Sequence, residues 1–254
     1  MKGLGKITTE QFIAPMSTTK TCTWQIEHNG SKRNFTFVDT PMGRLACEDV
    51  LGGKSYPALP LAGEIRTVVD IGANVGAATI YFACQFPAAR IWAFEPSPDS
   101  FALLTANTGD LPQVQRFAFG LFDRDHETLL YQGKDDAVEN SIGRSCELRD
   151  EGFPITLRSA DTALTEAGLD AIDILKLDTE GCELPILRSL TSRLPRTGVI
   201  YLEFHAERDR VEIDRLLLPT HALFRGKIMK PYRGELCYVA RACLPNTQMD
   251  ISVN

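Results

Sequence analysis

The chain has 254 residues, 44% of them hydrophobic and 24% charged, so it is long and apolar enough to bury one full core. Its net charge of −6, without a cluster of Lys and Arg, argues against a nucleic-acid partner, because phosphate binding relies on clustered basic residues. No run of about 18 apolar residues and no apolar signal core is found, so we expect a cytoplasmic protein with no membrane partner.

The N-terminal part is expected to be an appendage to the main domain. Residues 21 to 40 alternate in character around an Asn-Gly pair, which predicts a β-hairpin. The Gly-rich stretch from Cys47 to Pro57 is either a wall or lid over a site, with Lys54 and Tyr56 facing substrate or cofactor, or a solvated connector. We expect arm, hairpin and connector over residues 1–62 and one domain over residues 63–254.

The next stretch, TVVDIGANVGAAT from residue 67, predicts a buried strand, a tight turn and a helix. Ligands of parallel sheets bind at the carboxyl ends of strands, and a Gly-rich turn there lets the backbone approach them. In the dinucleotide fingerprint G-x-G-x-x-G the middle glycine makes room for a pyrophosphate, but here Asn74 takes that place. Asp70 would repel a phosphate and accept hydrogen bonds from an ammonium group or a hydroxyl, which S-adenosylmethionine offers without a phosphate.

A second strand, from Arg90, ends at Glu95, where a carboxylate can bind two ribose hydroxyls. A helix follows, with Ser97 as its N-cap. A third strand is predicted from Gln115 to Phe122, and Ala118 and Phe119 near its end are candidate cofactor contacts, although Phe119 alternatively belongs to the core. The expected cofactor-binding residues are Asp70, Gly72, Ala73, Asn74, Gly76, Glu95, Pro96, Ser97, Ala118, Phe119 and Asp178.

The region from Asp125 to Gly152 is polar and too long for an ordinary connection, so we expect it to be functional or mobile, with Asn140 and Ser141 facing the substrate. The apolar run IDILKLD from residue 172 then predicts a central strand that delivers Asp178 to the cofactor edge. By the two-residue period Lys176 lies on the same side and is placed to pair with Asp178.

A further buried strand, from Gly198, puts Glu203 and His205 on one face at its end. Three acids and a histidine should therefore converge near the methyl donor. Residues 223–230 and 235–242 alternate in character around a Pro-Tyr-Arg-Gly turn and predict a closing antiparallel pair.

Three segments together, DIGANVG at 70–76, FEP at 94–96 and DILKLDTEGCEL at 173–184, resemble the FkbM-type family of S-adenosylmethionine-dependent methyltransferases. The resemblance covers residues 68 to 205 and rests most on the third segment. It implies an α/β fold of the Rossmann-like class I methyltransferase type, with a seven-stranded, mostly parallel sheet and an antiparallel last strand. It also implies S-adenosyl-L-methionine as cofactor and methylation of a hydroxyl on a sugar or other small natural product.

Two hypotheses for catalysis follow, because an alcohol is too weak an acid to react unaided at neutral pH. In the first, Asp178 and Glu180 position the substrate hydroxyl, with His205 or Glu203 as general base. In the second, Asp178, Glu203 and His205 hold a divalent metal ion that lowers the hydroxyl pKa. Alternatively, Asp178 only caps the following helix and His205 is a hydrogen-bonded polar group at a strand end.

Other functions remain open on the same sequence. An RNA or protein methyltransferase would be favoured by a substrate tunnel lined by Lys or Arg, and no such stretch stands out. A nicotinamide-dependent oxidoreductase is disfavoured by Asn74 in the turn and by the lack of a Tyr-x-x-x-Lys dyad. A non-catalytic cofactor-binding module would be expected to lack Glu203 and His205, which are both present. The acceptor and the oligomeric state do not follow from the sequence.

Overall fold

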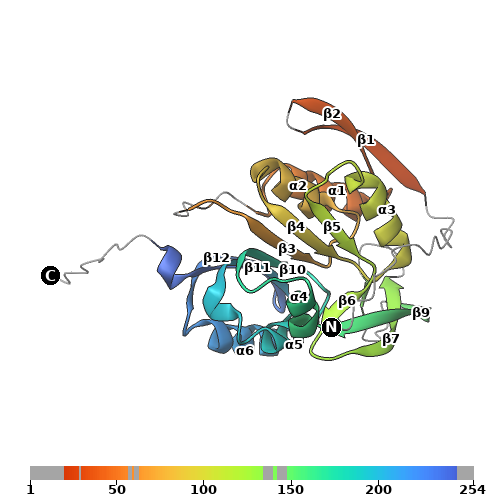
Figure 1. Ribbon diagram of the computed structural model, residues 1–254. Helices are drawn as coiled ribbons and strands as arrows, with labels where there is room; N and C mark the ends of the chain where they lie inside the picture. The colour runs from red at the N-terminus through yellow and green to blue at the C-terminus, as the bar shows by residue number, and fades with distance from the viewer. Residues whose placement is uncertain are drawn as a thin grey trace, which may run out of the picture.

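The computed structural model describes residues 20–28, 30–56, 59, 63–133, 140–141 and 148–244. Its centre is a seven-stranded sheet (Figure 1). Its strand order is β12-β13-β11-β10-β3-β4-β5. Neighbouring strands from β5 to β11 are parallel, whereas β13 is antiparallel to both β11 and β12. The predicted sheet with an antiparallel last strand is therefore confirmed. The bounds are β3 (Thr67–Ile71), β4 (Arg90–Phe94), β5 (Val114–Phe117), β10 (Ile172–Leu177), β11 (Thr197–Phe204), β12 (His221–Lys230) and β13 (Arg233–Ala240).

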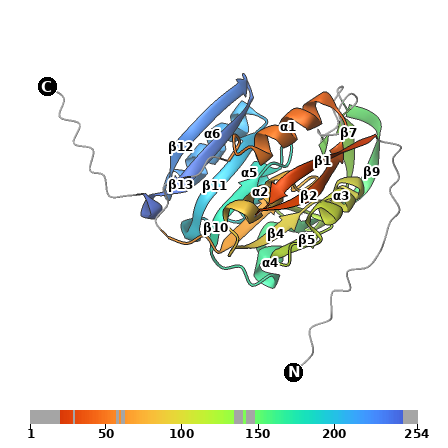
Figure 2. The same cartoon turned by 90° about the horizontal axis from the view of Figure 1, so that it is seen from above.

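Helices cover both faces of this sheet, as Figures 1 and 2 show. Side chains alternate along each strand, so Val68 and Ile174 pack toward one layer while Val69 and Leu175 pack toward the other. The first layer holds α1 (Pro41–Leu51), α2 (Ala77–Gln85) and α3 (Pro98–Thr108). The second holds α4 (Ala160–Glu166), α5 (Glu183–Ser189) and α6 (Glu207–Leu217). Single 3-10 turns, η1 (Leu194–Arg196) and η2 (Arg241–Cys243), precede β11 and follow β13.

The predicted N-terminal hairpin is present as β1 (Thr21–His28) and β2 (Ser31–Val38), with Asn29 of its turn outside the described residues. It is fastened to α3 by the Asn107 side chain, which accepts a hydrogen bond from the Thr36 N–H at 2.8 Å and donates to the Thr36 carbonyl at 2.7 Å. The same amide donates to the Val75 carbonyl at 2.8 Å. The hairpin is thereby linked to the turn after β3.

Helix α1 was not predicted. The expected Gly-rich connector is the last part of this helix followed by Gly52 and Gly53. The helix begins with Thr40 as N-cap, whose hydroxyl accepts a hydrogen bond from the Gly43 N–H, and with Pro41 in its first turn. The helical pattern is weak in the sequence because the helix contains Gly43 and buries only a few residues.

A second, four-stranded sheet also corrects the sequence analysis. Its order is β6-β9-β7-β8, formed by β6 (Gly120–Phe122), β7 (His126–Gly133), β8 (Asn140–Ser141) and β9 (Leu148–Ser159). The predicted third strand is thus split into β5 and β6, which belong to different sheets. A Cβ on Gly120 would lie 2.4 Å from Leu157, so glycine permits the close packing of β6 on β9. Much of the region expected to be a long connection is paired strand, except residues 134–139 and 142–147, which lie outside the described residues.

Residues 1–19 and 245–254, expected to be a loose arm and a frayed end, also lie outside the described residues. No helix in the part of the chain that the structure describes is long and apolar enough to cross a membrane.

Candidate functional site

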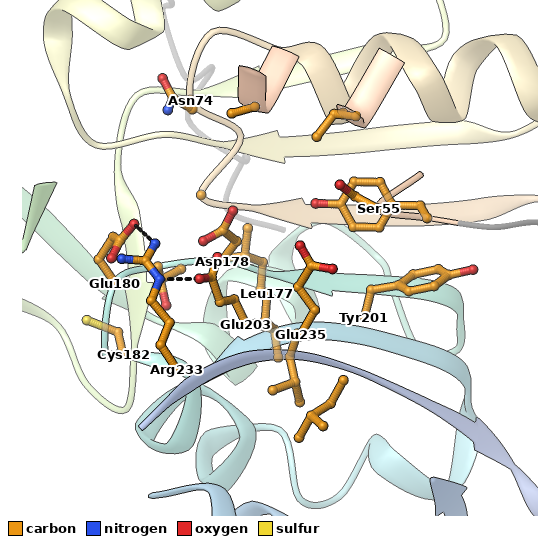
Figure 3. A pocket seen from close by; sticks show the side chains of 18 of the residues that line it. Ser55, Asn74, Leu177, Asp178, Glu180, Cys182, Tyr201, Glu203, Arg233 and Glu235 are labelled. Carbon is orange, nitrogen blue, oxygen red and sulfur yellow. Dashed lines mark hydrogen bonds and ion pairs between the residues drawn. The ribbon is translucent and has the colours of Figure 1, made fainter. Parts of the chain in front are cut away.

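A cavity of about 410 Å³ opens at the carboxyl ends of the parallel strands (Figure 3). The sheet register builds it, because paired residues on neighbouring strands face the same side. One row runs from Asp70 on β3 through Lys176, Tyr201 and Cys237 to Arg225 on β12. Two residues further along, the same face carries Asp178, Glu203, Glu235 and Lys227. The members of these rows on β11, β12 and β13 line the cavity together with Asp178, whereas Asp70 and Lys176 are buried beside it.

The turn after β3 approaches the end of β10 so closely that only glycine fits. Gly72 has φ +77°, and a Cβ there would lie 1.9 Å from the Asp178 carbonyl oxygen. Gly76, with φ +90°, is the N-cap of α2 and packs on α3. The N–H groups of Gly72 and Ala73 both donate to the Phe94 carbonyl at 3.0 Å, which ties this turn to β4. Asn74 also has a positive φ, of 48°, and lines the cavity.

Glu95 lies at the end of β4, as predicted, and lines the cavity together with Pro96. Its carboxylate accepts hydrogen bonds from the N–H groups of Asn74 and Ser97, both at 2.8 Å. Burial raises the pKa of Glu95 to about 7, although the two N–H groups act in the opposite direction. Ser97 is buried as the N-cap of α3, whose Ser100 N–H donates to it, and is not among the described residues that line the cavity.

Several predicted residues lie elsewhere. Ala118 is exposed and Phe119 packs against Phe94 and Phe117, while Gly120 and Leu121 line the cavity in their place. Lys54 is exposed and pairs with Asp49 at 2.8 Å, whereas Tyr56 lines the cavity and packs on the rings of Tyr81, Phe82 and Tyr201. The backbone of Asn140 and Ser141 forms β8, and their side chains lie outside the described residues.

Beneath the turn, Lys176 forms a buried polar centre. Its ammonium donates to the Gly72 carbonyl at 2.6 Å, lies 3.1 Å from Asp70 and lies 3.8 Å from Asp178. Asp70, with no exposed surface, also accepts a hydrogen bond from the Thr79 hydroxyl at 2.6 Å. Burial acts to lower the pKa of Lys176, but the neighbouring acids outweigh it and raise that pKa, so the ammonium stays charged. The sequence analysis expected Asp178 as the partner, but Asp70 is closer.

The acids at the ends of β10 and β11 converge as predicted. They surround the Arg233 guanidinium, which the sequence analysis did not predict. In Figure 3 the Arg233 guanidinium lies between Glu180 and Glu203: it is 3.2 Å from Glu180, and its Nε donates to Glu203. Glu180 has φ 52°, a strained conformation for a residue with a Cβ, and such strain concentrates at functional sites. Burial raises the pKa of Glu203 to about 7 and also raises that of Glu180. Arg233 lies on the last hairpin, where no motif marks it.

His205 is not among the described residues that line the cavity, although its Nε2 lies 3.8 Å from Glu203, which does line it. Its Nε2 is 2.9 Å from Glu180 and its Nδ1 is 3.4 Å from Glu183, a buried acid that the sequence analysis did not single out. Burial disfavours the imidazolium, but these two carboxylates outweigh burial and raise the pKa of His205 to about 11. The ring is therefore protonated at neutral pH and holds Glu180 in place.

The predicted metal set can be compared with this geometry. Asp178, Glu203 and His205 offer ligand atoms that all lie within 4.8 Å of one another. However, a protonated imidazole has no lone pair for a metal, and Arg233 already binds Glu203. A metal would therefore have to displace the Arg233 guanidinium from Glu203 and a proton from His205 before it could bind these three residues.

Comparison with known proteins assigns the chain to a family. A family model described as the methyltransferase FkbM domain matches residues 70–226. The chain belongs to the FkbM methyltransferase family. The family implies methyl transfer as the activity and S-adenosylmethionine as the methyl donor.

Relatives of this FkbM methyltransferase include AMB antimetabolite synthetase AmbE of Pseudomonas aeruginosa, 31% identical over 179 residues, with 56% of this chain and 8% of AmbE covered. The 2-O-methyltransferase NoeI of Sinorhizobium fredii is 29% identical over 151 residues, with 54% of this chain and 62% of NoeI covered. The chain thus spans less than two thirds of either relative. Methyltransferase FkbM from Methylobacillus flagellatus has a similar fold, with a TM-score of 0.50 at 16% identity over 74% of this chain and 47% of that chain.

Proposed function

We propose that this FkbM methyltransferase transfers a methyl group from S-adenosylmethionine to a hydroxyl oxygen of a sugar or other small natural product. One observation carries the proposal: carboxylates at the ends of β10 and β11 converge on a cavity directly beside the Gly72 turn. The relative NoeI is a 2-O-methyltransferase, which supports an oxygen acceptor.

The cofactor side of the cavity fits a nucleoside. At Gly72 the backbone, which carries no side chain there, lies against the end of β10. Asn74 and Glu95 line the cavity next to this glycine. Glu95 would hold the ribose hydroxyls, since its buried carboxylate already accepts two hydrogen bonds and has further lone pairs. Bound S-adenosylmethionine supplies a methyl group activated by the adjacent sulfonium.

On the acceptor side, the chain must orient a hydroxyl and remove its proton. Asp178, partly exposed at the junction of the two strand ends, is placed to accept a hydrogen bond from that hydroxyl. Glu203 is the proposed general base, because a carboxyl with a pKa of about 7 is half ionised at neutral pH and holds a proton well. Arg233 and His205 keep Glu180 and Glu203 in position rather than exchanging protons.

The test compares single variants in a methyl-transfer assay with radiolabelled S-adenosylmethionine and a panel of sugars and small alcohols. Loss of the general base should lower kcat by about 10²- to 10⁴-fold in Glu203→Gln, with cofactor affinity unchanged by calorimetry. His205→Gln should lower kcat less, because His205 acts through Glu180. If Glu203→Gln kept kcat within threefold while His205→Gln abolished turnover, the assignment of the base would be wrong.

Two further measurements separate the alternatives. Dialysis against EDTA should leave turnover unchanged, whereas activity that returns only with added Mg²⁺ or Mn²⁺ would favour the metal hypothesis for Asp178, Glu203 and His205. Calorimetry with NAD should show no binding, and tight NAD binding would instead favour an oxidoreductase. Labelled RNA or protein in place of a small molecule would favour the other class of methyltransferase.

A further inference from the structure

The wall of the cavity opposite the turn is basic. The hairpin of β12 and β13 contains four Lys and Arg residues, and all four line the cavity: Arg225, Lys227, Lys230 and Arg233. Lysines on an edge strand also prevent aggregation, but that role is served by either face of the strand. The concentration of these charges at the cavity, in a chain of net charge −6, therefore needs a different explanation.

Only some of these cations are neutralised by the protein. Arg233 is held by Glu180 and Glu203, and Lys227 lies 3.9 Å from Glu235. Arg225 and Lys230 form no ion pair with any residue in the described ranges 20–28, 30–56, 59, 63–133, 140–141 and 148–244. These two positive charges thus face the cavity outside any ion pair, although the charge of Arg225 also acts on the nearby Glu235 carboxyl. Together with Lys227 they make that wall complementary to an anion.

The register gives the separation between the two ends of the cavity. Lys227 pairs with Glu235 on β13, and Glu235 pairs with Glu203 on β11. Two strand spacings therefore separate Glu203 from Lys227, or about 10 Å at the usual spacing of neighbouring strands. The carboxylates near the methyl donor repel an anion while the basic residues attract it, so an acceptor with one charged group has one favoured orientation.

On this geometry, and resting on the proposed function, we infer that the acceptor is a small anion. It carries a carboxylate or phosphate about 10 Å from the hydroxyl that is methylated, and Arg225, Lys227 and Lys230 bind this group. A polyanion such as RNA is disfavoured by the net charge of −6, and the basic residues that line the cavity all come from one hairpin. The anionic group sets the affinity for the acceptor, while Asp178 and Glu203 act on its hydroxyl.

The experiment uses the full chain, radiolabelled S-adenosylmethionine and the small molecules extracted from the source organism. The labelled product should be retained by an anion exchanger at pH 7. If phosphatase treatment removes the retention, the group is a phosphate, and if carbodiimide coupling to a neutral amine removes it, the group is a carboxylate. A labelled small product that passes through the exchanger would overturn the inference but leave the proposed function intact.

Variants then test the residues. With the retained acceptor, Arg225→Gln/Lys230→Gln should raise KM at least tenfold and leave kcat within about threefold, because these residues bind the acceptor away from the reacting hydroxyl. The matched control, Lys32→Gln/Arg66→Gln, removes the same charge from exposed positions on β2 and before β3, and should leave KM unchanged. Equal KM values in the two double variants would refute the assignment. No labelled small molecule at all, or label only in RNA, would overturn the proposed function and this inference with it.

Discussion

Replacing Lys176 by Met tests whether the buried ammonium holds the cofactor turn together. Lys176 is 3% exposed, donates to the Gly72 carbonyl at 2.6 Å and lies 3.1 Å from the fully buried Asp70 carboxylate. Removing one partner of a buried ion pair costs about 3–5 kcal/mol, because the other charge is left uncompensated. We expect Lys176→Met to lower the free energy of unfolding by that amount in urea titrations followed by circular dichroism.

A double variant separates the cost of the unpaired Asp70 charge from the loss of the hydrogen bond to the Gly72 carbonyl. Asp70→Asn in the Lys176→Met background removes the stranded carboxylate and should recover about 2 kcal/mol or more of the loss. It should not restore cofactor affinity, since the Gly72 carbonyl still lacks its donor and the turn is no longer held against β10. A loss below about 1 kcal/mol in Lys176→Met, or full affinity in the double variant, would refute this account of the turn.

Four further substitutions probe the cofactor side and two positions away from it. Gly72→Ala should abolish cofactor binding in calorimetry, because its Cβ would lie 1.9 Å from a backbone oxygen, whereas Gly168→Ala, with φ +71° and open space around it, should cost only about 1–2 kcal/mol of stability. Burial raises the pKa of Glu95 from 4.5 to about 7, so cofactor affinity should fall about tenfold per pH unit below pH 7 and become flat in Glu95→Gln. Between pH 4.5 and 7 the folded state keeps the Glu95 proton that the unfolded state has lost, so the free energy of unfolding of the cofactor-free protein should fall as pH rises through this range. A free energy of unfolding that rises over this range and does not change in Glu95→Gln would contradict the raised pKa. Arg193→Met, which removes a buried guanidinium that binds Asp161 at 3.0 Å and the Leu169 carbonyl, should cost about 2–4 kcal/mol and leave KM unchanged; a changed KM would show that Asp161 has more than a structural role.

The cofactor half of the site could be predicted because its signals are local. Gly72 and Glu95 each follow a short apolar run directly, and parallel strands bring their carboxyl ends to one edge of the sheet. The same reasoning placed Asp178 and Glu203 together. In each case the residue type and the strand that precedes it suffice, and no knowledge of distant contacts is needed.

The other half depends on contacts between distant segments. Arg233 and Glu180 are 53 positions apart in the chain, and no sequence spacing indicates that they form a pair. The protonation of His205 depends in part on Glu183, the first residue of α5. No sequence pattern indicates that this carboxylate lies close to the imidazole. Strand β7 and all but the last residues of β9, where a short strand at Leu157–Ser159 is expected from the sequence, were missed. Each has one polar face, and only a small apolar cluster of Leu130, Ile155 and Leu157 packs between them.

The family match covers most of the site but not all of its walls. The match covers residues 70–226, which contain the turn at Gly72, Glu95 and the acids at the ends of β10 and β11. Helix α1, which forms one wall of the cavity, precedes the match, and Lys227, Lys230 and Arg233 on the opposite wall follow it. The match thus includes Arg225 and the proposed donor side, while α1 and the rest of the basic hairpin lie outside it. We expect the choice of acceptor to depend most on these unmatched parts. A relative with the same donor side and a different last hairpin should therefore share the cofactor and differ in acceptor.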